Sequence, residues 1–380
     1  MTQPPTPTYT LADSPRTWGE TLRHLGQAPR LGLDTEADSR HHYPEKVCLL
    51  QVSIPHAVYV VDPLAGLDMA PLAGVLADPG VEKVLHGADF DLRGMHRDWG
   101  HTVRGLYDTN VAARLAGLER VGLAALLEDL LGLTIPKEER LQRADWSRRP
   151  LSAEALAYAA GDVAHLFALR DALDAKLGEL GRRGWAAEEF ERLEQVRYTP
   201  PDPETTFLGV KGSHRLGPQG LAVLRELHGV REAEALRLDR PPGFIINAET
   251  LVNMSAKPET PLMEVPGLSP AIARRMGRSL EGALERGRAS APYRRPPAEF
   301  PPRPRPTNAE HHRLAKLKEW RTGLGKELAL DPSLCWPARS LERLAREPGA
   351  LDAELDSPEV RRWQREAFGI GLRKALAGAG

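Results

Sequence analysis

The stretch Leu31–Asp38 reads LGLDTEAD and places two acidic residues, Asp34 and Glu36, directly after a run typical of a buried strand. Side chains of a strand alternate between its two faces, so residues two apart in sequence point to the same side. Both carboxylates would therefore share one face of a sheet. Like charges held so close repel each other, and the pattern predicts that another group at the site offsets this repulsion.

The size and composition of the chain are those of an ordinary soluble protein. Its 380 residues, 41% hydrophobic and 27% charged with a formal net charge of -1, predict two or three domains. The first residues lack a signal-peptide pattern and no apolar run is long enough to cross a bilayer, so we expect a cytoplasmic protein without a membrane partner. Two cysteines, Cys48 and Cys335, are too few for a disulfide framework or a cysteine-based zinc site.

Short apolar and β-branched runs predict a sheet in the first part of the chain, and helical spacing follows it. The strands are expected at 30–36, 47–53, 57–62 and 83–86, and the helices at 90–100, 109–118, 123–132 and in one long run over 152–183. Strands followed by helices, with one helix between strands, indicate an α/β layer fold.

Proline and glycine mark the boundaries of the later segments. A Pro/Gly-rich stretch near Tyr198 ends the first region, and the stretch APYRRPPAEFPPRPRP separates two helical regions. We therefore expect a first domain over 1–200, a helical domain over 213–288, a Pro/Arg-rich linker over 289–307 and a second helical domain over 308–380.

The two helical regions resemble each other weakly at an offset of about 90 residues. The pairs in register are Arg231 with Arg321, Leu251 with Leu341, and Pro258 with Pro348. Duplication of a small domain accounts for the preserved order of these residues. Chance matching of two helical stretches rich in arginine and leucine is the alternative.

Further acidic residues follow the later elements. In VLHGADFDLRGM, Asp89 and Asp91 open a predicted helix, where a carboxylate can cap the N-terminus, and this role suits Asp89 better than Asp91. In ALAYAAGDVAHL, Tyr158 and Asp162 are four residues apart on a predicted helix and share one face. The sequence thus offers four acids and one tyrosine for a single site.

Convergence of these carboxylates without matching bases predicts bound cations. Oxygen ligands without cysteine or paired histidine suit Mg²⁺ or Mn²⁺ better than zinc. The chain contains no HExxH, GxxxxGK[ST] or GxGxxG motif, which argues against a zinc protease, a P-loop enzyme and a dinucleotide-binding protein.

The order DTE, HGADFDL with YDT, and YAAGD resembles the three motifs of the DEDD superfamily of 3′ to 5′ exonucleases, in the subgroup whose third motif is Tyr-x-x-x-Asp. The stretches YPEKVCLLQVS, DTNVAARL and LQRADWSRRPLS are similar to the ribonuclease D branch and extend the resemblance over nearly the whole N-terminal half. It implies a ribonuclease H-like exonuclease fold for 1–200.

The resemblance also implies roles for the site residues. Two divalent cations, Mg²⁺ or Mn²⁺, would activate a water on one side of a phosphodiester and stabilise the leaving 3′ oxygen on the other. Tyr158 would orient that water, since a phenol with an ordinary pKa of about 10 is a poor base at neutral pH. Nucleoside 5′-monophosphates would leave one at a time from a 3′ end. The implied metal ligands are Asp34, Glu36, Asp91 and Asp162.

The helical regions resemble the HRDC domain, a small bundle found in ribonuclease D and in RecQ-type helicases. Gly220 to about Arg286 carries the resemblance, and the region 308–380 looks like a second, more diverged copy. The resemblance implies that the substrate is RNA with a free 3′ end, in particular a tRNA precursor. We expect the protein to act as a monomer.

Two other functions remain open at this stage. An exonuclease acting on DNA ends would use the same metal site, because discrimination requires contact to the 2′-hydroxyl and the motifs do not show one. A catalytically silent nucleic-acid-binding scaffold is the third possibility. The presence of Tyr158 and all the acids argues against it.

Three other residues near the motifs are not expected to bind metal. Asp108 is expected to support a helix start rather than to bind a metal, and His86 to close a core strand. Arg149 is expected either to contact a backbone phosphate or to form an ion pair within its own loop.

Overall fold

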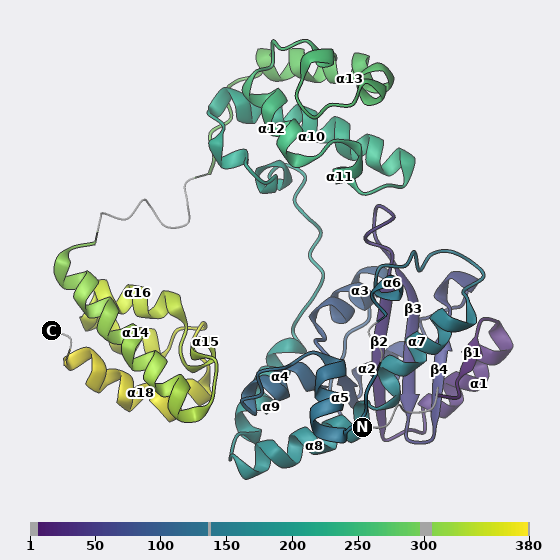
Figure 1. Cartoon of the computed structure of the whole chain (residues 1–380), viewed down its shortest axis with the longest axis vertical. Coiled ribbons are helices and arrows are strands. Elements are labelled where there is room, and N and C mark those ends of the chain that lie inside the picture. The colour runs from purple at the N-terminus through teal and green to yellow at the C-terminus, as the bar shows by residue number, and fades with distance from the viewer. Residues whose placement is uncertain (1–6, 136–137, 297–305, 379–380) are drawn as a thin grey trace. The chain divides into compact units, whose positions relative to one another are not determined.

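The computed structural model describes residues 7–135, 138–296 and 306–378 (Figure 1). The chain forms two compact units. The first comprises Met1–Glu36, Val47–Tyr198 and Pro304–Gly380, and the second comprises Ala37–Lys46 and Thr199–Arg303. Among the helices in the described ranges, none is long and apolar enough to cross a membrane.

A six-stranded mixed sheet organises the first unit, in the order β1-β4-β3-β2-β5-β6. The pairs β1 with β4, β2 with β5 and β5 with β6 are parallel, and β3 with β4 is antiparallel. The four longer strands lie where the sequence predicts them. The two terminal strands were not predicted, because three residues are too few to show an alternating pattern. The strands are β1 (Thr10–Ala12), β2 (Arg30–Ala37), β3 (Val47–Ile54), β4 (Ala57–Val61), β5 (Glu82–Leu85) and β6 (Leu106–Asp108).

Helices cover both faces of this sheet and bury β3 almost completely. The strand residues Leu50 and Val52 belong to the core on one face, whereas Leu49 belongs to the core beneath α7 on the other. The helices of this region are α1 (Pro15–Leu25), α2 (Leu72–Ala77), α3 (Asp89–Trp99), α4 (Thr109–Leu115), α5 (Leu123–Leu131), α6 (Glu139–Gln142), α7 (Ala153–Ala164), α8 (Leu166–Glu179) and α9 (Arg183–Leu193).

The long helical run expected over 152–183 is divided into two helices, α7 and α8. Ser152 caps α7 by accepting a hydrogen bond from the backbone N–H of Ala155 (3.1 Å). The helix ends at Ala164, because His165 leaves the helical conformation with φ -112° and ψ 5°. This break lets α7 lie over β3 and β4 while α8 packs against β5.

A C-terminal bundle completes the first unit and shares a hydrophobic core with α4, α5, α8 and α9. The rings of Trp185 and Trp363 stack with centroids 4.6 Å apart. Arg182 donates to the backbone oxygens of Leu115 (2.8 Å) and Leu328 (2.7 Å), which ties both parts together. The bundle consists of α14 (Asn308–Leu328), α15 (Pro332–Cys335), α16 (Ala338–Arg346), α17 (Leu351–Leu355) and α18 (Arg362–Ala377).

The second unit is a bundle with its own core and a closely similar order of elements. Its helices are α10 (Pro218–Leu238), α11 (Pro242–Ile245), α12 (Ala248–Ala256) and α13 (Pro270–Ala289). Both α11 and α12 begin 90 positions before α15 and α16. Asp239 after α10 and Ala329 after α14 both adopt the left-handed conformation, with φ 49° and 50°. The two bundles therefore keep the register of the sequence repeat.

The second unit also includes the segment 37–46, which joins β2 to β3. Tyr43 donates through its hydroxyl to Glu232 (2.5 Å) on α10. The Asp239 carboxylate accepts from the Tyr43 backbone N–H (3.1 Å) and lies 2.7 Å from His42 Nδ1. The segment that directly follows Glu36 is thus held by the first helical bundle.

Close packing of the sheet face leads to a prediction for Gly32. A Cβ added at this position would lie 2.3 Å from Ser53 Oγ and 3.3 Å from Leu166 Cδ1. We expect Gly32→Ala to destabilise the protein by about 1–3 kcal/mol, because a packed core resists extra volume. Urea unfolding measures the change. Gly19→Ala is the control, since no atom lies within 4 Å of its added Cβ and alanine favours the helix. Equal midpoints for the two variants would contradict the prediction.

Candidate active site

The carboxylates of β2 and α7 meet at one end of the sheet. Asp34 and Glu36 lie two residues apart on β2 and share a face, and Asp162 projects from α7, which covers that face. One oxygen of each of these three residues lies within 4.8 Å of the other two. The arrangement predicted from the quoted stretch is therefore present, and α7 supplies its third member.

Asp91 lies beside this cluster rather than within the 4.8 Å group. It is buried in the first turn of α3 and accepts a hydrogen bond from the Thr35 hydroxyl at 2.5 Å. Its charge still raises the pKa of Asp34 and of Glu36. The structure thus brings the fourth acid to the site and orients it through the residue that separates the two acids of β2.

Burial raises the pKa of all four acids, and the charges of neighbouring acids in the cluster raise it further for Asp34 and Glu36. Burial, followed by the charge of Asp91, holds the pKa of Asp34 well above its usual range. The pKa of Glu36 rises to about 9 through burial and then the charge of Asp162. Burial also raises the pKa of Asp91 and of Asp162 to about 7. Full ionisation of the cluster at neutral pH therefore requires compensating positive charge.

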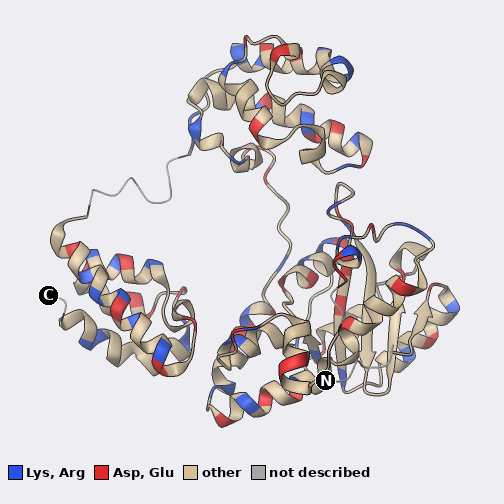
Figure 2. Cartoon of the chain, in the orientation of Figure 1, with Lys and Arg blue, Asp and Glu red and all other residues tan. Residues whose placement is uncertain are grey.

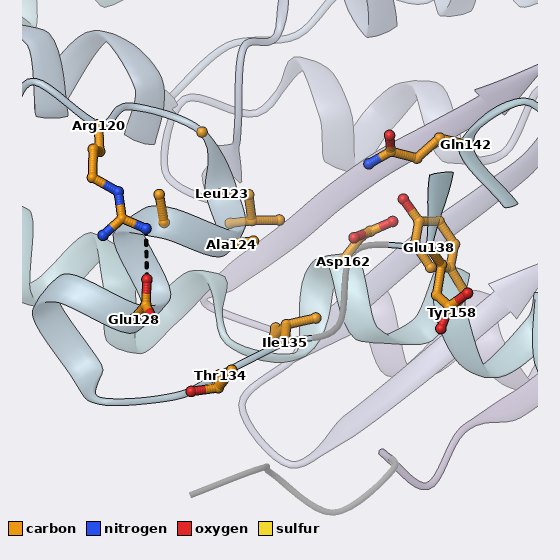
Figure 3. Close-up of a pocket in the computed structure, with 12 residues that line it drawn as sticks. Arg120, Leu123, Ala124, Glu128, Thr134, Ile135, Glu138, Gln142, Tyr158 and Asp162 are labelled. Atoms are coloured by element: carbon orange, nitrogen blue, oxygen red, sulfur yellow. Dashed lines mark hydrogen bonds and ion pairs between the residues drawn. The ribbon is translucent and has the colours of Figure 1, made fainter. Parts of the chain in front are cut away.

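Tyr158 lies one helical turn before Asp162 and points toward it, together with Gln142 of α6 (Figure 3). Its side chain lines the same cavity as Asp162 and Gln142. Burial, and then the charge of Asp162, raise the pKa of Tyr158 far above its usual value. The hydroxyl therefore keeps its proton at physiological pH. The ring centroid lies 6.3 Å from that of the buried Trp146, which belongs to the same core.

Two cavities adjoin these residues. One of about 250 Å³ is lined by Asp34, Glu36, Asp162 and His86, among others. The other, of about 450 Å³, lies on the side of Tyr158 and Asp162 facing α5 (Figure 3). Its wall combines apolar residues with acids, and Arg120 at its edge forms ion pairs with Glu128 and Asp129. The lining consists of Arg120, Gly122, Leu123, Ala124, Ala125, Glu128, Thr134, Ile135, Glu138, Gln142, Tyr158 and Asp162.

Asp108 performs the supporting role that the sequence suggests. It caps α4 by accepting from the backbone N–H groups of Asn110 (2.8 Å) and Val111 (3.1 Å). It also accepts from the backbone N–H groups of Gly87 (3.1 Å) and Ala88 (2.8 Å). One carboxylate therefore fixes the connection between β5 and α3, which carries His86.

His86 is a site residue that sequence analysis missed. It follows the last residue of β5, as expected for the end of a core strand, but its side chain lines the smaller cavity. His86 begins the stretch HGADFD, which ends with the predicted ligand Asp91. This closeness in sequence is the signal that could have identified His86 as a site residue.

Arg149 and Asp89 have structural partners. Arg149 forms an ion pair with Asp62, with two N···O distances of 2.6 Å, so its partner is an acid outside its own loop and not the expected one within it. The expected cap by Asp89 is wrong, because Ala88 occupies the cap position and Asp89 instead pairs with Arg93 one turn later. The connection is already fixed by Asp108, which leaves no capping task for Asp89.

Comparison with known proteins places the chain among nucleases. A 3′-5′ exonuclease family model matches residues 9–178, and an HRDC domain model matches residues 220–284. The chain is 35% identical to Ribonuclease D of Gluconacetobacter diazotrophicus, covering 92% of this chain and 88% of that protein, and 33% identical to Ribonuclease D of Pseudomonas paraeruginosa, covering 95% of each. The crystal structure of Escherichia coli RNase D, an exoribonuclease involved in structured RNA processing, shares the fold at a TM-score of 0.74 with 23% identity, over 98% of this chain and 99% of that one.

The raised pKa values predict how stability responds to pH and to divalent cations. Acids whose pKa is higher in the folded state stabilise it fully below their unfolded pKa of about 4, and this contribution is lost as the pH rises through their folded pKa. Without metal, we therefore expect the melting temperature to fall between pH 6 and pH 9, through values of about 7 for Asp91 and Asp162 and about 9 for Glu36.

Thermal unfolding with EDTA and with Mn²⁺ tests this response. The fall should be shallower in Asp34→Asn and should be offset by Mn²⁺ in the unsubstituted protein. Asp89→Asn is the matched control, because Asp89 is exposed and pairs with Arg93. Equal slopes for Asp34→Asn and the unsubstituted protein would show that the cluster does not govern the pH response.

Proposed function

The chain belongs to the ribonuclease D family, and from this membership we propose that the acidic cluster on β2 and α7 is the centre at which it hydrolyses RNA from the 3′ end. The protein is a 3′ to 5′ exoribonuclease. The observation that carries the assignment to this site is the approach of Asp34, Glu36 and Asp162 oxygens to within 4.8 Å beside Tyr158.

The residues present suit divalent cations. All donors at the cluster are carboxylate oxygens, the ligand type that Mg²⁺ and Mn²⁺ prefer, and their raised pKa values signal a need for positive charge. Asp34, Glu36 and Asp162 would hold two such ions, with Asp91 as the fourth acid. When bound, the ions make a water nucleophilic and stabilise the leaving oxygen.

Tyr158 positions the nucleophile in this proposal. Its hydroxyl keeps its proton, so it acts by hydrogen bonding rather than as a general base. Asp162 and Gln142 line the cavity beside this side chain, so the hydroxyl faces the acidic end of the site. Cleavage at the terminal phosphodiester then releases a nucleoside 5′-monophosphate.

The larger cavity suits the nucleoside rather than the phosphate. Its apolar residues Leu123, Ala124 and Ile135 offer a surface for a base, whereas the carboxylate of Glu138 repels a phosphodiester. The scissile phosphate would lie toward the acids of β2, where cations offset its charge.

The helical bundles extend the proposal to the rest of the chain. We assign an exonuclease domain to 1–200, an HRDC domain to 213–288 and a second HRDC-like domain to 308–380. The match of the HRDC model to 220–284 and the shared element order of the two bundles support this assignment. Part of the expected linker, 297–305, lies outside the described residues.

Structured RNA, most specifically tRNA precursors, is the proposed substrate, and the protein is proposed to act as a monomer. Basic and acidic residues are interspersed over the helices of both bundles (Figure 2). Several of the arginines near the linker bind within the protein, as in the Arg286 to Glu226 ion pair (2.8 Å) and the Arg321 bond to the Trp336 oxygen (3.2 Å). In this proposal, the RNA phosphates contact basic residues of the bundles other than Arg286 and Arg321.

Loss of a metal-binding carboxylate should abolish nucleotide release. We expect Asp34→Ala and Asp162→Ala each to slow release of 5′-monophosphates from 3′-labelled RNA by on the order of a hundredfold or more, because charge stabilisation in the transition state is lost. Asp89→Ala removes a nearby exposed carboxylate and should retain activity. EDTA should stop release, and Mg²⁺ or Mn²⁺ should restore it. Equal release from matched DNA would indicate a general exonuclease, and binding without release would indicate a scaffold.

Replacement of the tyrosine separates positioning from metal binding. Tyr158→Phe should lower kcat by about 10- to 100-fold, because a positioned hydrogen bond to the nucleophile is lost. Calorimetric titration should show an unchanged affinity for Mn²⁺, since the hydroxyl is not a ligand. A loss of Mn²⁺ affinity as large as that of Asp162→Ala would contradict this division of roles.

A further inference from the structure

The groove by which the first bundle holds Tyr43 has a counterpart in the second bundle. In the first bundle, Tyr43 packs against the core, and the carboxylates of Glu232 and Asp239 accept hydrogen bonds from its hydroxyl and its backbone N–H. The register of the repeat, in which α10 spans 218–238 and α14 spans 308–328, places Thr322 and Ala329 at the same two points. Both line a cavity of about 580 Å³, which we call the bundle cavity.

The walls of the bundle cavity come from the second bundle and from the connection between α4 and α5. A Cβ added at Gly117 would lie 2.3 Å from the backbone oxygen of Ala329, so the two walls are in contact. Leu118, Val121 and Leu330 contribute apolar surface. The volume lies within the range of about 300–1,000 Å³ that is usual for small-ligand sites. The cavity therefore has room for one ring and its substituents.

Differences between the two copies change the kind of group that the groove suits. Tyr43 offers two hydrogen-bond donors, and the first bundle meets them with two carboxylates. Thr322 and Ala329 carry no charge at these points, and Lys326 stands where the first bundle has Leu236. The second groove thus keeps space for a ring but favours an anionic substituent over a donor.

Two basic side chains at the bundle cavity are available to such an anion. Arg114 and Lys326 line the cavity, are exposed, and form no ion pair with an acid of the described ranges. Of the two acids in the lining, Asp331 accepts a hydrogen bond from the backbone N–H of Ser333 (2.7 Å), and Glu119 is exposed to solvent. A ring that carries an anion is the chemistry of a nucleotide.

The connection between α4 and α5 also separates this cavity from the proposed active site. Glu119 and Val121 line the bundle cavity. Arg120 and Gly122 line the larger cavity that contains Tyr158 (Figure 3). Alternate residues of one short stretch therefore border the two cavities. A strand that leaves the site through the larger cavity has to cross only this stretch to reach the second bundle.

We propose that the bundle cavity binds one nucleotide of the RNA substrate on the 5′ side of the scissile bond. The base lies against the apolar wall, and its phosphate lies near Arg114 and Lys326. The inference rests on the proposed function, because it takes the 3′ end to lie at the acids of β2. It gives the second bundle a part in substrate binding at a fixed distance from the cleaved bond.

Removal of single bases tests the contact in the full-length chain. RNAs with one abasic site at successive positions from the 3′ end are compared by kcat/KM for release of the first nucleotide in Mn²⁺. One position away from the end should lower kcat/KM by about tenfold, the worth of one base contact. No effect at any such position would overturn the proposal.

A variant that fills the cavity links this effect to the second bundle. Thr322→Phe should lower kcat/KM for intact RNA by about tenfold and remove the further effect of the abasic site, because the base no longer enters. Ala315→Phe is the matched control, since Ala315 is exposed on the same helix and does not line the cavity. Equal melting temperatures for the two variants show that both fold. An abasic effect that persists unchanged in Thr322→Phe would place the base elsewhere.

Replacement of the lysine separates a phosphate contact from support of the fold. Lys326→Ala should weaken RNA binding and reduce the slope of log Kd against log salt concentration by about 0.7, as expected for one phosphate of a single strand. Lys318→Ala, an exposed lysine of the same helix outside the cavity lining, should leave the slope unchanged. An unchanged slope in Lys326→Ala would contradict the phosphate contact.

Cross-linking gives a readout that does not depend on turnover. RNAs with one 4-thiouridine at successive positions are irradiated with Asp34→Ala, and the attached peptides are identified by mass spectrometry. Attachment to 114–121 or 322–334 from one position, lost in Thr322→Phe, would support the proposal. Attachment only to other segments would overturn it.

Failure of the proposed function and failure of this inference give different results. No nucleotide release together with the cross-link would remove the proposed reaction and support the contact, whereas normal release without it would do the reverse. A synthetic peptide with the sequence of 37–46 probes the other class of occupant. Peptide binding that is lost in Thr322→Phe, without any RNA cross-link, would identify a protein groove and overturn the proposal.

Discussion

Repulsion among carboxylates that the backbone holds together is the constraint on which the rest of this structure depends. β2 directs Asp34 and Glu36 to one face, and α7 places Asp162 against them, within 4.8 Å. In the absence of cations the acids lower their charge by retaining protons, with the pKa of Glu36 reaching about 9. Without cations, the clustered acids therefore destabilise the folded protein. Such destabilisation is expected at a site whose function depends on binding charged partners.

The surrounding residues make this cluster rigid at modest cost. Ser152 caps α7, Thr35 orients Asp91, and Asp108 ties the β5–α3 connection to the start of α4. Thr35 and Asp108 are short buried side chains whose hydrogen bonds are completed inside the protein, so they add little penalty for burial. They give the side chains of the proposed site fixed directions, as a hydrolysis controlled by positioning would require.

The two helical bundles share the same order of helices. Each begins with a long helix that ends at a left-handed residue, Asp239 or Ala329, and continues with a short helix that begins at a proline. The first bundle also binds the segment 37–46, which leaves β2 directly after Glu36. The second shares the core of the exonuclease helices through Trp185 and Trp363. The C-terminal bundle is thus part of the unit that contains the sheet, whereas the first bundle has its own core.

The sequence by itself determined the four main strands, the two-residue spacing of Asp34 and Glu36, the one-turn spacing of Tyr158 and Asp162, and the 90-residue repeat. These features depend on local periodicity, which is written in neighbouring residues. The sequence pattern did not predict β1 and β6, because three residues are too few to show a period. It also did not predict the helix break at His165, because packing of α7 and α8 on different strands overrides local propensity there.

Only the tertiary structure decided which acids meet, because Asp34 and Asp162 come together through the packing of α7 on the sheet. It also decided the roles of Arg149, Asp89 and His86. Arg149 was equally suited to a phosphate or an ion pair until Asp62, far away in sequence, was found beside it. His86 Nδ1 lies 2.9 Å from the hydroxyl of Thr109, which lies on another element. Side-chain partners across long sequence separations follow from the fold as a whole, and no local pattern encodes them.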